Sequence, residues 1–151
     1  MRTMHWLLTY VGIFIFFALD RILKLVASRL EDNVELISET FVFAFEKNRE
    51  ISWNIPLSSW PLYLLIGIII VILIILLGKA YRQKNFVLVT GILLILVGAL
   101  SNILDRIWYG AVIDYLKVLA WPTSNLADVM IFIGVVIIAF GVIRSQEKKP
   151  L

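Results

Sequence analysis

Four aspartates stand within or beside strongly apolar stretches of this chain: Asp20, Asp105, Asp114 and Asp128. Two carboxylates that lie close together cannot both ionise, so one keeps a proton while the other can activate water. A pair of aspartates can therefore hydrolyse a peptide bond by general acid–base catalysis, without a covalent intermediate. The four aspartates are therefore candidates for such a pair.

Most other catalytic groups are excluded by composition. The chain has no cysteine, which rules out disulfides, thiolate metal sites and a cysteine nucleophile. Its one histidine, His5, lies at the start of the first apolar run, far from the expected position of the aspartates. We interpret it as an interfacial residue, so neither a Ser-His-Asp triad nor a histidine-based zinc site is expected. The chemistry left is that of carboxylates, with no metal and no organic cofactor.

Two of the four aspartates have a base close by in sequence. Lys24 lies one helical turn from Asp20, and Arg106 directly follows Asp105, so each acid has a candidate ion-pair partner. A charge at the centre of a membrane helix costs roughly 2.5–3.5 kcal/mol, and less near the helix end. We favour structural ion pairs for Asp20 and Asp105.

The other two aspartates lack such a partner. Asp114 has only Lys117 nearby, and strand alternation would place that residue on the opposite face. Asp128 follows Asn125 by three residues, and its apolar run holds no base before Arg144. A structural role for Asp128, as a cap-like residue or through hydrogen bonds with Asn125 and backbone amides, stays open. Asp114 and Asp128 are the candidate catalytic pair.

The elements that position these acids are expected to be membrane helices. Of the 151 residues 61% are hydrophobic and 17% are charged, with a mean hydropathy of +0.94. Four apolar runs approach the roughly 20 residues that cross a bilayer; they cover about 6–26, 60–77, 86–104 and 126–143. We expect an all-α membrane protein of four transmembrane helices, forming one domain over residues 1–151.

Basic residues predict the orientation of these spans. The link between the second and third spans carries Lys79, Arg82 and Lys84 and no acid, which is typical of a cytoplasmic loop. Both termini are then cytoplasmic, and the connections of about 30–59 and 105–124 face outward. The net charge of +3 is interpreted as a topology signal, and no nucleic-acid partner is expected.

The outward connections show strand and turn patterns. Phenylalanines alternate through Thr40–Glu46, and residues 111–116 follow a turn signal at Tyr109-Gly110, so both segments are expected to be short strands. They would form a small sheet on the outer membrane surface. Residues 51–59 are expected to form an interfacial turn before the second span.

Four segments resemble motifs of the bacterial lipoprotein signal peptidases (signal peptidase II). Residues 97–106 (VGALSNILDR) look like the family's GGALGNLIDR, and 110–115 (GAVIDY) are similar to its G-x-V-x-D-F/Y. Residues 124–128 (SNLAD) resemble F-N-x-A-D, and 18–24 (ALDRILK) match its D-Q-x-x-K pattern. Each motif is weak alone. Their shared order and the four-span layout extend the resemblance over nearly the whole chain.

The resemblance implies an aspartic endopeptidase of the bacterial cytoplasmic membrane with Asp114 and Asp128 as its catalytic dyad. Its substrate would be a diacylglyceryl-modified prolipoprotein, cut before the modified cysteine near the outer face. Membrane lipid is the other expected partner, inhibitors such as globomycin would bind at the dyad, and a monomer suffices since one chain supplies both acids. The implied supporting residues are Asn48, Asn102, Arg106 and Asn125, with Asp20 and Lys24 as a structural or substrate-orienting pair.

The chain departs from the family pattern at four positions. Glu50 and Ser101 replace glycines, Arg21 replaces a glutamine, and Ser124 stands where phenylalanine is common. If the family glycine at position 50 has a positive φ, glutamate there would be strained, so we expect a rebuilt loop. These departures bear on substrate fit rather than on the dyad.

Three other functions are weighed against hydrolysis. A non-catalytic binding protein on the same scaffold would explain the rebuilt outer loop, but the retained dyad argues against it. A small proton or ion carrier would need an acid at mid-depth in a span, whereas Asp128 is near a span end and the second and third spans carry no charge. A purely structural subunit leaves the four motifs unexplained.

Overall fold

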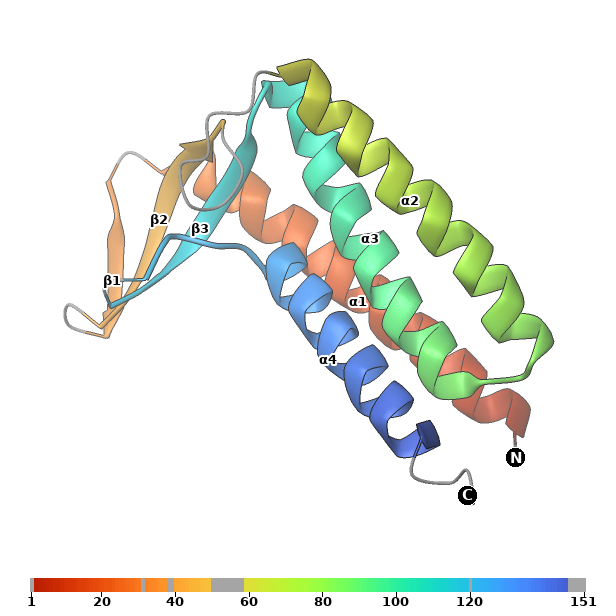
Figure 1. Cartoon of the computed structure of the whole chain (residues 1–151). Coiled ribbons are helices and arrows are strands. Elements are labelled where there is room, and N and C mark those ends of the chain that lie inside the picture. Colours follow the sequence, from red (N-terminus) through yellow and green to blue (C-terminus); the bar gives the residue numbers. More distant parts are fainter. Residues whose placement is uncertain (1, 31, 38–39, 50–58, 120, 147–151) are drawn as a thin grey trace.

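Four long helices form a bundle with a small sheet beside one of its ends (Figure 1). The structure, a computed structural model, describes residues 2–30, 32–37, 40–49, 59–119 and 121–146. Its elements are α1 (Arg2–Ala27), β1 (Val34–Ile37), β2 (Phe41–Asn48), α2 (Ser59–Arg82), α3 (Phe86–Tyr109), β3 (Val112–Val118) and α4 (Leu126–Gln146). The start of α1 and the end of α4 lie at the end of the bundle away from the sheet.

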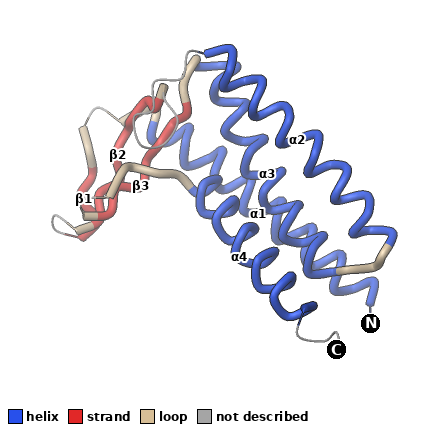
Figure 2. Tube along the Cα trace, in the orientation of Figure 1, coloured by secondary structure: helices blue, strands red, loops and turns tan. Residues whose placement is uncertain are grey.

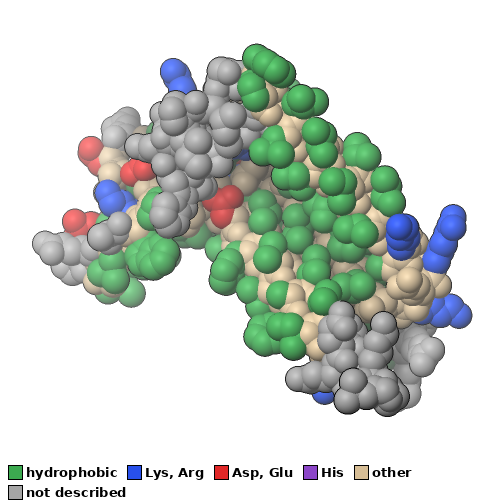
Figure 3. Space-filling view, viewed as in Figure 1, with side chains coloured by type: hydrophobic (Ala, Val, Ile, Leu, Met, Phe, Trp, Pro, Cys, Tyr) green, Lys and Arg blue, Asp and Glu red, His purple; other side chains and the backbone are tan. Residues whose placement is uncertain are grey.

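All four helices are long and apolar enough to cross a membrane. Their outward surfaces carry large exposed hydrophobic side chains (Figure 3), which lipid solvates and water does not. The expectation of a mostly helical protein with four membrane-capable helices is confirmed. The predicted small sheet is also present, and it has three strands. Its orientation in the membrane stays a prediction.

Two helices extend well beyond the predicted apolar runs. α2 continues to Arg82 rather than 77, and α3 continues to Tyr109 rather than 104. An apolar run marks the part of a helix that faces lipid, whereas backbone hydrogen bonding continues through polar residues. Gly110 ends α3 in the left-handed conformation (φ 68°), and its N–H donates to the Arg106 carbonyl. The prediction that residue 105 begins an outer loop was therefore wrong.

The sheet is antiparallel and has the order β1-β2-β3 (Figure 2). Its two longer strands confirm the strands predicted at Thr40–Glu46 and 111–116, and β2 continues to Asn48. Strand β1 was not predicted. Glu46 stands opposite Asp114, after an irregularity in the register of β2 and β3. The predicted interfacial turn, with Glu50, lies in a segment largely outside the described residues.

Helices α3 and α4 approach each other closely through glycines. A Cβ added to Gly98 would stand 2.6 Å from the Ala127 carbonyl oxygen, and one added to Gly134 would stand 2.6 Å from the Gly91 carbonyl oxygen. Real Cβ atoms do not make such contacts with backbone, so this packing requires glycine. It brings the first turn of α4, with Asp128, against the polar part of α3.

The sheet is attached to the bundle by a buried apolar cluster. Ile113 and Tyr115 of β3 pack with Ala27 at the end of α1, and all three side chains are almost fully buried. Because side chains alternate along a strand, Asp114 points away from this cluster. The strand thereby presents one carboxylate toward the helices α3 and α4.

Candidate active site

The two aspartates predicted to form the dyad meet where β3 reaches the start of α4. Asp114 lies on β3 and is 2% exposed, while Asp128 in the first turn of α4 is partly exposed. Asn125 joins them: its Nδ2 donates to Asp114 Oδ1 at 2.6 Å, and its Oδ1 accepts from the Asp128 backbone N–H at 2.9 Å. One amide therefore caps α4 and ties both aspartates together.

Asp114 is held by amide groups and not by a cation. Besides Asn125, Asn48 at the end of β2 donates from Nδ2 to Asp114 Oδ2 at 2.9 Å. The pKa of Asp114 is raised from 3.8 to about 6, chiefly by burial and also by the charge of Asp128, although the amide hydrogen bonds and Lys24 oppose the shift. A carboxyl in this environment is suited to hold a proton near neutral pH.

Asp128 is held in the same manner by Asn102 of α3, whose Nδ2 donates to Asp128 Oδ1 at 2.8 Å. Lys24 Nζ donates to the Asn102 Oδ1 at 2.9 Å. An ammonium group only donates, so it turns the Asn102 oxygen toward itself and the NH₂ toward Asp128. The backbone N–H of Asp128 fixes Asn125 in the same way. Both asparagines are thus obliged to donate to a dyad carboxylate.

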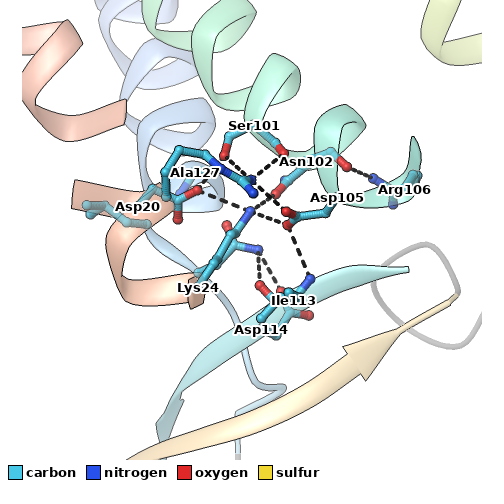
Figure 4. Close-up of polar contacts among 12 residues, drawn as sticks. Asp20, Lys24, Ser101, Asn102, Asp105, Arg106, Ile113, Asp114 and Ala127 are labelled. Carbon is cyan, nitrogen blue, oxygen red and sulfur yellow. Dashed lines mark hydrogen bonds and ion pairs between the residues drawn. The ribbon is translucent and has the colours of Figure 1, made fainter. Parts of the chain in front are cut away.

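A cluster of four charges adjoins this pair, and Figure 4 labels three of its members, Asp20, Lys24 and Asp105. Lys24 Nζ is 2.6 Å from Asp105 Oδ2 and 3.1 Å from Asp20 Oδ2, and Arg21 Nη1 is 2.6 Å from Asp105 Oδ1. Asp20, Lys24 and Asp105 are almost completely buried. The predicted Asp20–Lys24 pair is confirmed. Two acids and two bases make the cluster neutral.

The expected pairing of Asp105 with Arg106 was wrong. Successive residues on a helix point about 100° apart, so neighbours in sequence do not face each other. Asp105 turns to Lys24 and Arg21 on α1, and Arg106 Nη1 donates to the Asn102 carbonyl oxygen at 3.3 Å. Arg106 is within electrostatic range of Asp114 and Asp128 but forms no ion pair with either in the described part of the chain.

Asp20 links four elements of the fold. Its Oδ2 accepts from the Ser101 hydroxyl at 2.5 Å, and its Oδ1 accepts from the Tyr115 hydroxyl at 3.0 Å and the Ala127 N–H at 3.2 Å. The Tyr115 oxygen also accepts from the Leu126 N–H at 3.1 Å. Burial beside the Asp20 charge raises the pKa of Tyr115, so this phenol stays a donor. Asp20 therefore fixes the start of α4, and with it Asp128.

Three contributors to this network were not assigned a role from sequence. Tyr115 stood in a quoted motif only as the neighbour of Asp114. Arg21 and Ser101 were noted as two separate departures, yet Arg21 Nη1 donates to the Ser101 Oγ at 3.2 Å and to its carbonyl oxygen at 3.1 Å. The signal available was that Arg21 adjoins Asp20 and that Ser101 lies one helical turn before Asp105. The contact between these positions, 80 residues apart, could not be inferred from either motif.

The arrangement can perform acid–base chemistry at a site reached from the surface. A buried carboxyl with a raised pKa stands beside a partly exposed carboxylate, and each is oriented by a neutral amide. Among the described residues, no group of three or more His, Cys, Asp or Glu side chains is placed to hold a metal ion.

Comparison with known proteins gives consistent matches. The family described as signal peptidase (SPase) II matches residues 12–144. A lipoprotein signal peptidase of Halothermothrix orenii is 32% identical, covering 93% of this chain and 98% of the relative. One of Psychromonas ingrahamii is 33% identical, covering 91% and 85%.

Solved structures share the fold. A bacterial membrane enzyme solved at 2.3 Å resolution superposes with a TM-score of 0.78 and 23% identity, over 95% of this chain and 92% of that one. Another, solved at 1.9 Å, gives a TM-score of 0.72 and 24% identity, over 89% and 91%. These likenesses concern the arrangement of the backbone.

Proposed function

The chain belongs to the signal peptidase II family, and on that premise we propose that it is an aspartic endopeptidase that removes the signal peptide from diacylglyceryl-modified bacterial prolipoproteins. Family membership and the four membrane-capable helices make it a multi-pass bacterial membrane protease. The observation that carries the aspartic mechanism is the joining of Asp114 and Asp128 through Asn125, with neutral amides as their hydrogen-bond partners.

In the proposed reaction the more buried Asp114 holds the shared proton and Asp128 takes one from water. The water oxygen attacks the scissile carbonyl carbon while Asp114 donates its proton to the carbonyl oxygen, which gives a tetrahedral diol. Asp128 then returns its proton to the amide nitrogen, Asp114 takes back a diol proton, and the C–N bond breaks. Asn102 and Asn125 keep both carboxylates aimed at the same point throughout.

The proposed topology puts both chain termini and the link between α2 and α3 in the cytoplasm, and the dyad near the outer face of the cytoplasmic membrane. Support comes from Lys79 and Arg82 in the last turn of α2 and from Lys84 soon after it, and Figure 3 shows basic side chains at the end of the bundle remote from the sheet. A signal peptide spanning the same membrane then presents its outer end to the dyad. We infer that a monomer is active and that globomycin binds at the dyad.

The test is a gel-shift cleavage assay with purified protein in lipid vesicles. Wild type, Asp114→Asn and the matched control Glu35→Gln, which changes an exposed acid of β1, receive the diacylglyceryl-modified precursor and the unmodified precursor. We expect cleavage of the modified form alone by wild type and control, and none by Asp114→Asn. Near-normal cleavage by Asp114→Asn would refute the dyad; no cleavage by folded wild type would favour a binding protein.

A further inference from the structure

An apolar groove runs along α3 beside α1, and α2 borders its larger part. It consists of two adjoining cavities of about 470 Å³ and 320 Å³, which share Tyr10 of α1 and Leu93 of α3. The larger reaches Arg82 near the end of α2, and the smaller reaches Leu100 on α3. The groove belongs to neither the dyad nor the charge cluster.

The length of the groove corresponds to one leaflet of a bilayer. Its lining on α3 runs from Val89 to Leu100, eleven residues along the helix. At a rise of 1.5 Å per residue this is about 16 Å, roughly half of a hydrocarbon core of about 30 Å. An acyl chain that starts at the membrane surface therefore fills the groove, whereas a spanning peptide helix extends well beyond it.

The mouth of the groove is basic and aromatic. Arg82 lines it, and Lys79 and Lys84 stand close by in sequence, with no acid between residues 79 and 86. None of these three bases forms an ion pair within the described residues. Beside them the Trp6 ring packs against Tyr10, Tyr81 and Phe86, with ring centroids 4.8–6.0 Å apart. Such an aromatic belt with unpaired cations is typical of headgroup depth.

Two kinds of apolar molecule in a membrane could fill the groove, a signal peptide and a phospholipid, and they differ in charge. A signal peptide carries a positively charged segment before its apolar core, and the bases at the mouth would repel it. A phospholipid with net negative charge presents a phosphate to Arg82 and an apolar tail to the groove. We propose that this groove binds one anionic phospholipid, with its phosphate at Arg82 and an acyl chain lying along Tyr10 and Leu93.

The bound lipid would join α2 to the rest of the bundle. Helix α2 packs principally on α3, while α3 also packs on α1 and α4. A lipid tail between α1 and α2 adds apolar contact to the least supported helix. This role concerns assembly of the bundle and does not depend on the proposed peptidase reaction.

Glycines of α2 provide a matched pair of variants. A Cβ added at Gly78, which lines the groove, meets no heavy atom within 4 Å, and the same holds at Gly67, which lines neither cavity. Gly78→Trp therefore places an indole at the groove with open space around its Cβ, and Gly67→Trp adds the same side chain elsewhere on the same helix. Arg82→Gln and Arg144→Gln, which changes a base in the last turn of α4, form a second pair, of which only Arg82 lines the groove.

The experiment is native mass spectrometry of the full chain from detergent, titrated with phosphatidylglycerol and, separately, with phosphatidylcholine of the same acyl chains. We expect one tightly held phosphatidylglycerol in wild type, Gly67→Trp and Arg144→Gln. Arg82→Gln should bind it about fivefold more weakly, the equivalent of ~1 kcal/mol for one surface cation. Gly78→Trp should lose the tightly held lipid.

Three outcomes would overturn the proposal. Equal retention of the two lipids in wild type would show that the groove does not select an anionic headgroup. Unchanged phosphatidylglycerol binding in Gly78→Trp would place the lipid elsewhere. A Gly78→Trp variant that keeps the lipid but shows a raised KM for precursor, or an altered oligomeric state, would assign the groove to the substrate helix or to a second copy of the chain.

Discussion

Two groups of aspartates lie side by side in this protein and differ in their partners. Asp20 and Asp105 are paired with Lys24 and Arg21 at 2.6–3.1 Å. Asp114 and Asp128 accept hydrogen bonds from asparagine amides, and neither has a cation within ion-pair distance in the described residues. The residue type is the same, but the first group is neutralised by bases and the second is not.

The type of hydrogen-bond partner determines what each group of carboxyls can do. A buried carboxylate bound to a cation is held in its charged form, and breaking such a pair leaves an uncompensated charge. An amide orients a carboxylate but brings no net charge, so the group can still gain or lose a proton. The cation Lys24 serves both groups, because it neutralises Asp105 directly and turns Asn102 toward Asp128. Substitutions should therefore separate stability from catalysis.

The largest expected effect follows from changing Asp128 to asparagine. The amide cannot take a proton from water, so kcat should fall by about 10³-fold or more. Asp128 is not part of an ion pair among the described residues, and the thermal unfolding midpoint should stay within a few degrees of wild type. Single-turnover cleavage and thermal unfolding of the same preparation measure both. A large drop in unfolding temperature would mean that Asp128 stabilises the fold, as Asp20 and Asp105 are expected to do.

Asp105→Asn should show the opposite pattern. It leaves Lys24 and Arg21 with Asp20 as their remaining carboxylate in the cluster, and the loss of one partner of a buried ion pair costs about 3–5 kcal/mol. Asparagine has one accepting oxygen in place of two, so Lys24, Arg21 and the Ile113 N–H cannot all keep their acceptor, which weakens the attachment of β3 beside Asp114. We expect a clearly lower unfolding temperature in detergent. A variant that is as stable as wild type but inactive would mean that Asp105 acts in the reaction and does not stabilise the fold.

Asp114 should give the protein a pH-dependent stability that Asp114→Asn lacks. Its pKa is raised from 3.8 to about 6 on folding, so the folded state binds the proton more tightly than the unfolded state. This contribution is fully present below about pH 3.8 and is lost as the pH rises through about 6; two pKa units correspond to ~3 kcal/mol.

The measurement compares unfolding midpoints of wild type and Asp114→Asn between pH 4 and pH 8. Other acids titrate in both proteins, so the difference between the two curves isolates Asp114. Wild type should lose stability relative to the variant as the pH rises through 6. Parallel curves would contradict a buried, proton-holding Asp114.

Much of this organisation could be predicted from local sequence. Apolar runs of about 20 residues indicated the four helices, and alternation of phenylalanines indicated β2. The acids that lacked a nearby base, Asp114 and Asp128, are the two that the fold places together around Asn125. Each of these predictions used residues that are close together in sequence, or the lack of a base near an acid in sequence.

The remaining features depend on contacts between distant segments. The Arg21–Asp105 pair joins residues 84 positions apart, and no periodicity reveals it. Strand β1 is a four-residue edge strand with all its side chains exposed, so it lacks the alternation that identifies a half-buried strand. Asn48 was assigned through family resemblance alone. Its partner Asp114 is 66 positions away and is reached by strand register.

The smallest expected effect distinguishes the two bases of the structural cluster. Arg21 is 19% exposed and Lys24 is 1% exposed, and Asp105 keeps Lys24 when Arg21 is removed. Arg21→Gln should therefore cost about 1 kcal/mol, as for a partly exposed pair with a stacked ring, here Trp108 at 5.4 Å. Lys24→Gln should cost several times more and should also lower kcat, because Asn102 is then free to rotate its NH₂ away from Asp128. Unfolding midpoints and kcat of both variants test this order. Equal losses of stability would mean that the cluster depends on total charge and that burial of Lys24 adds nothing.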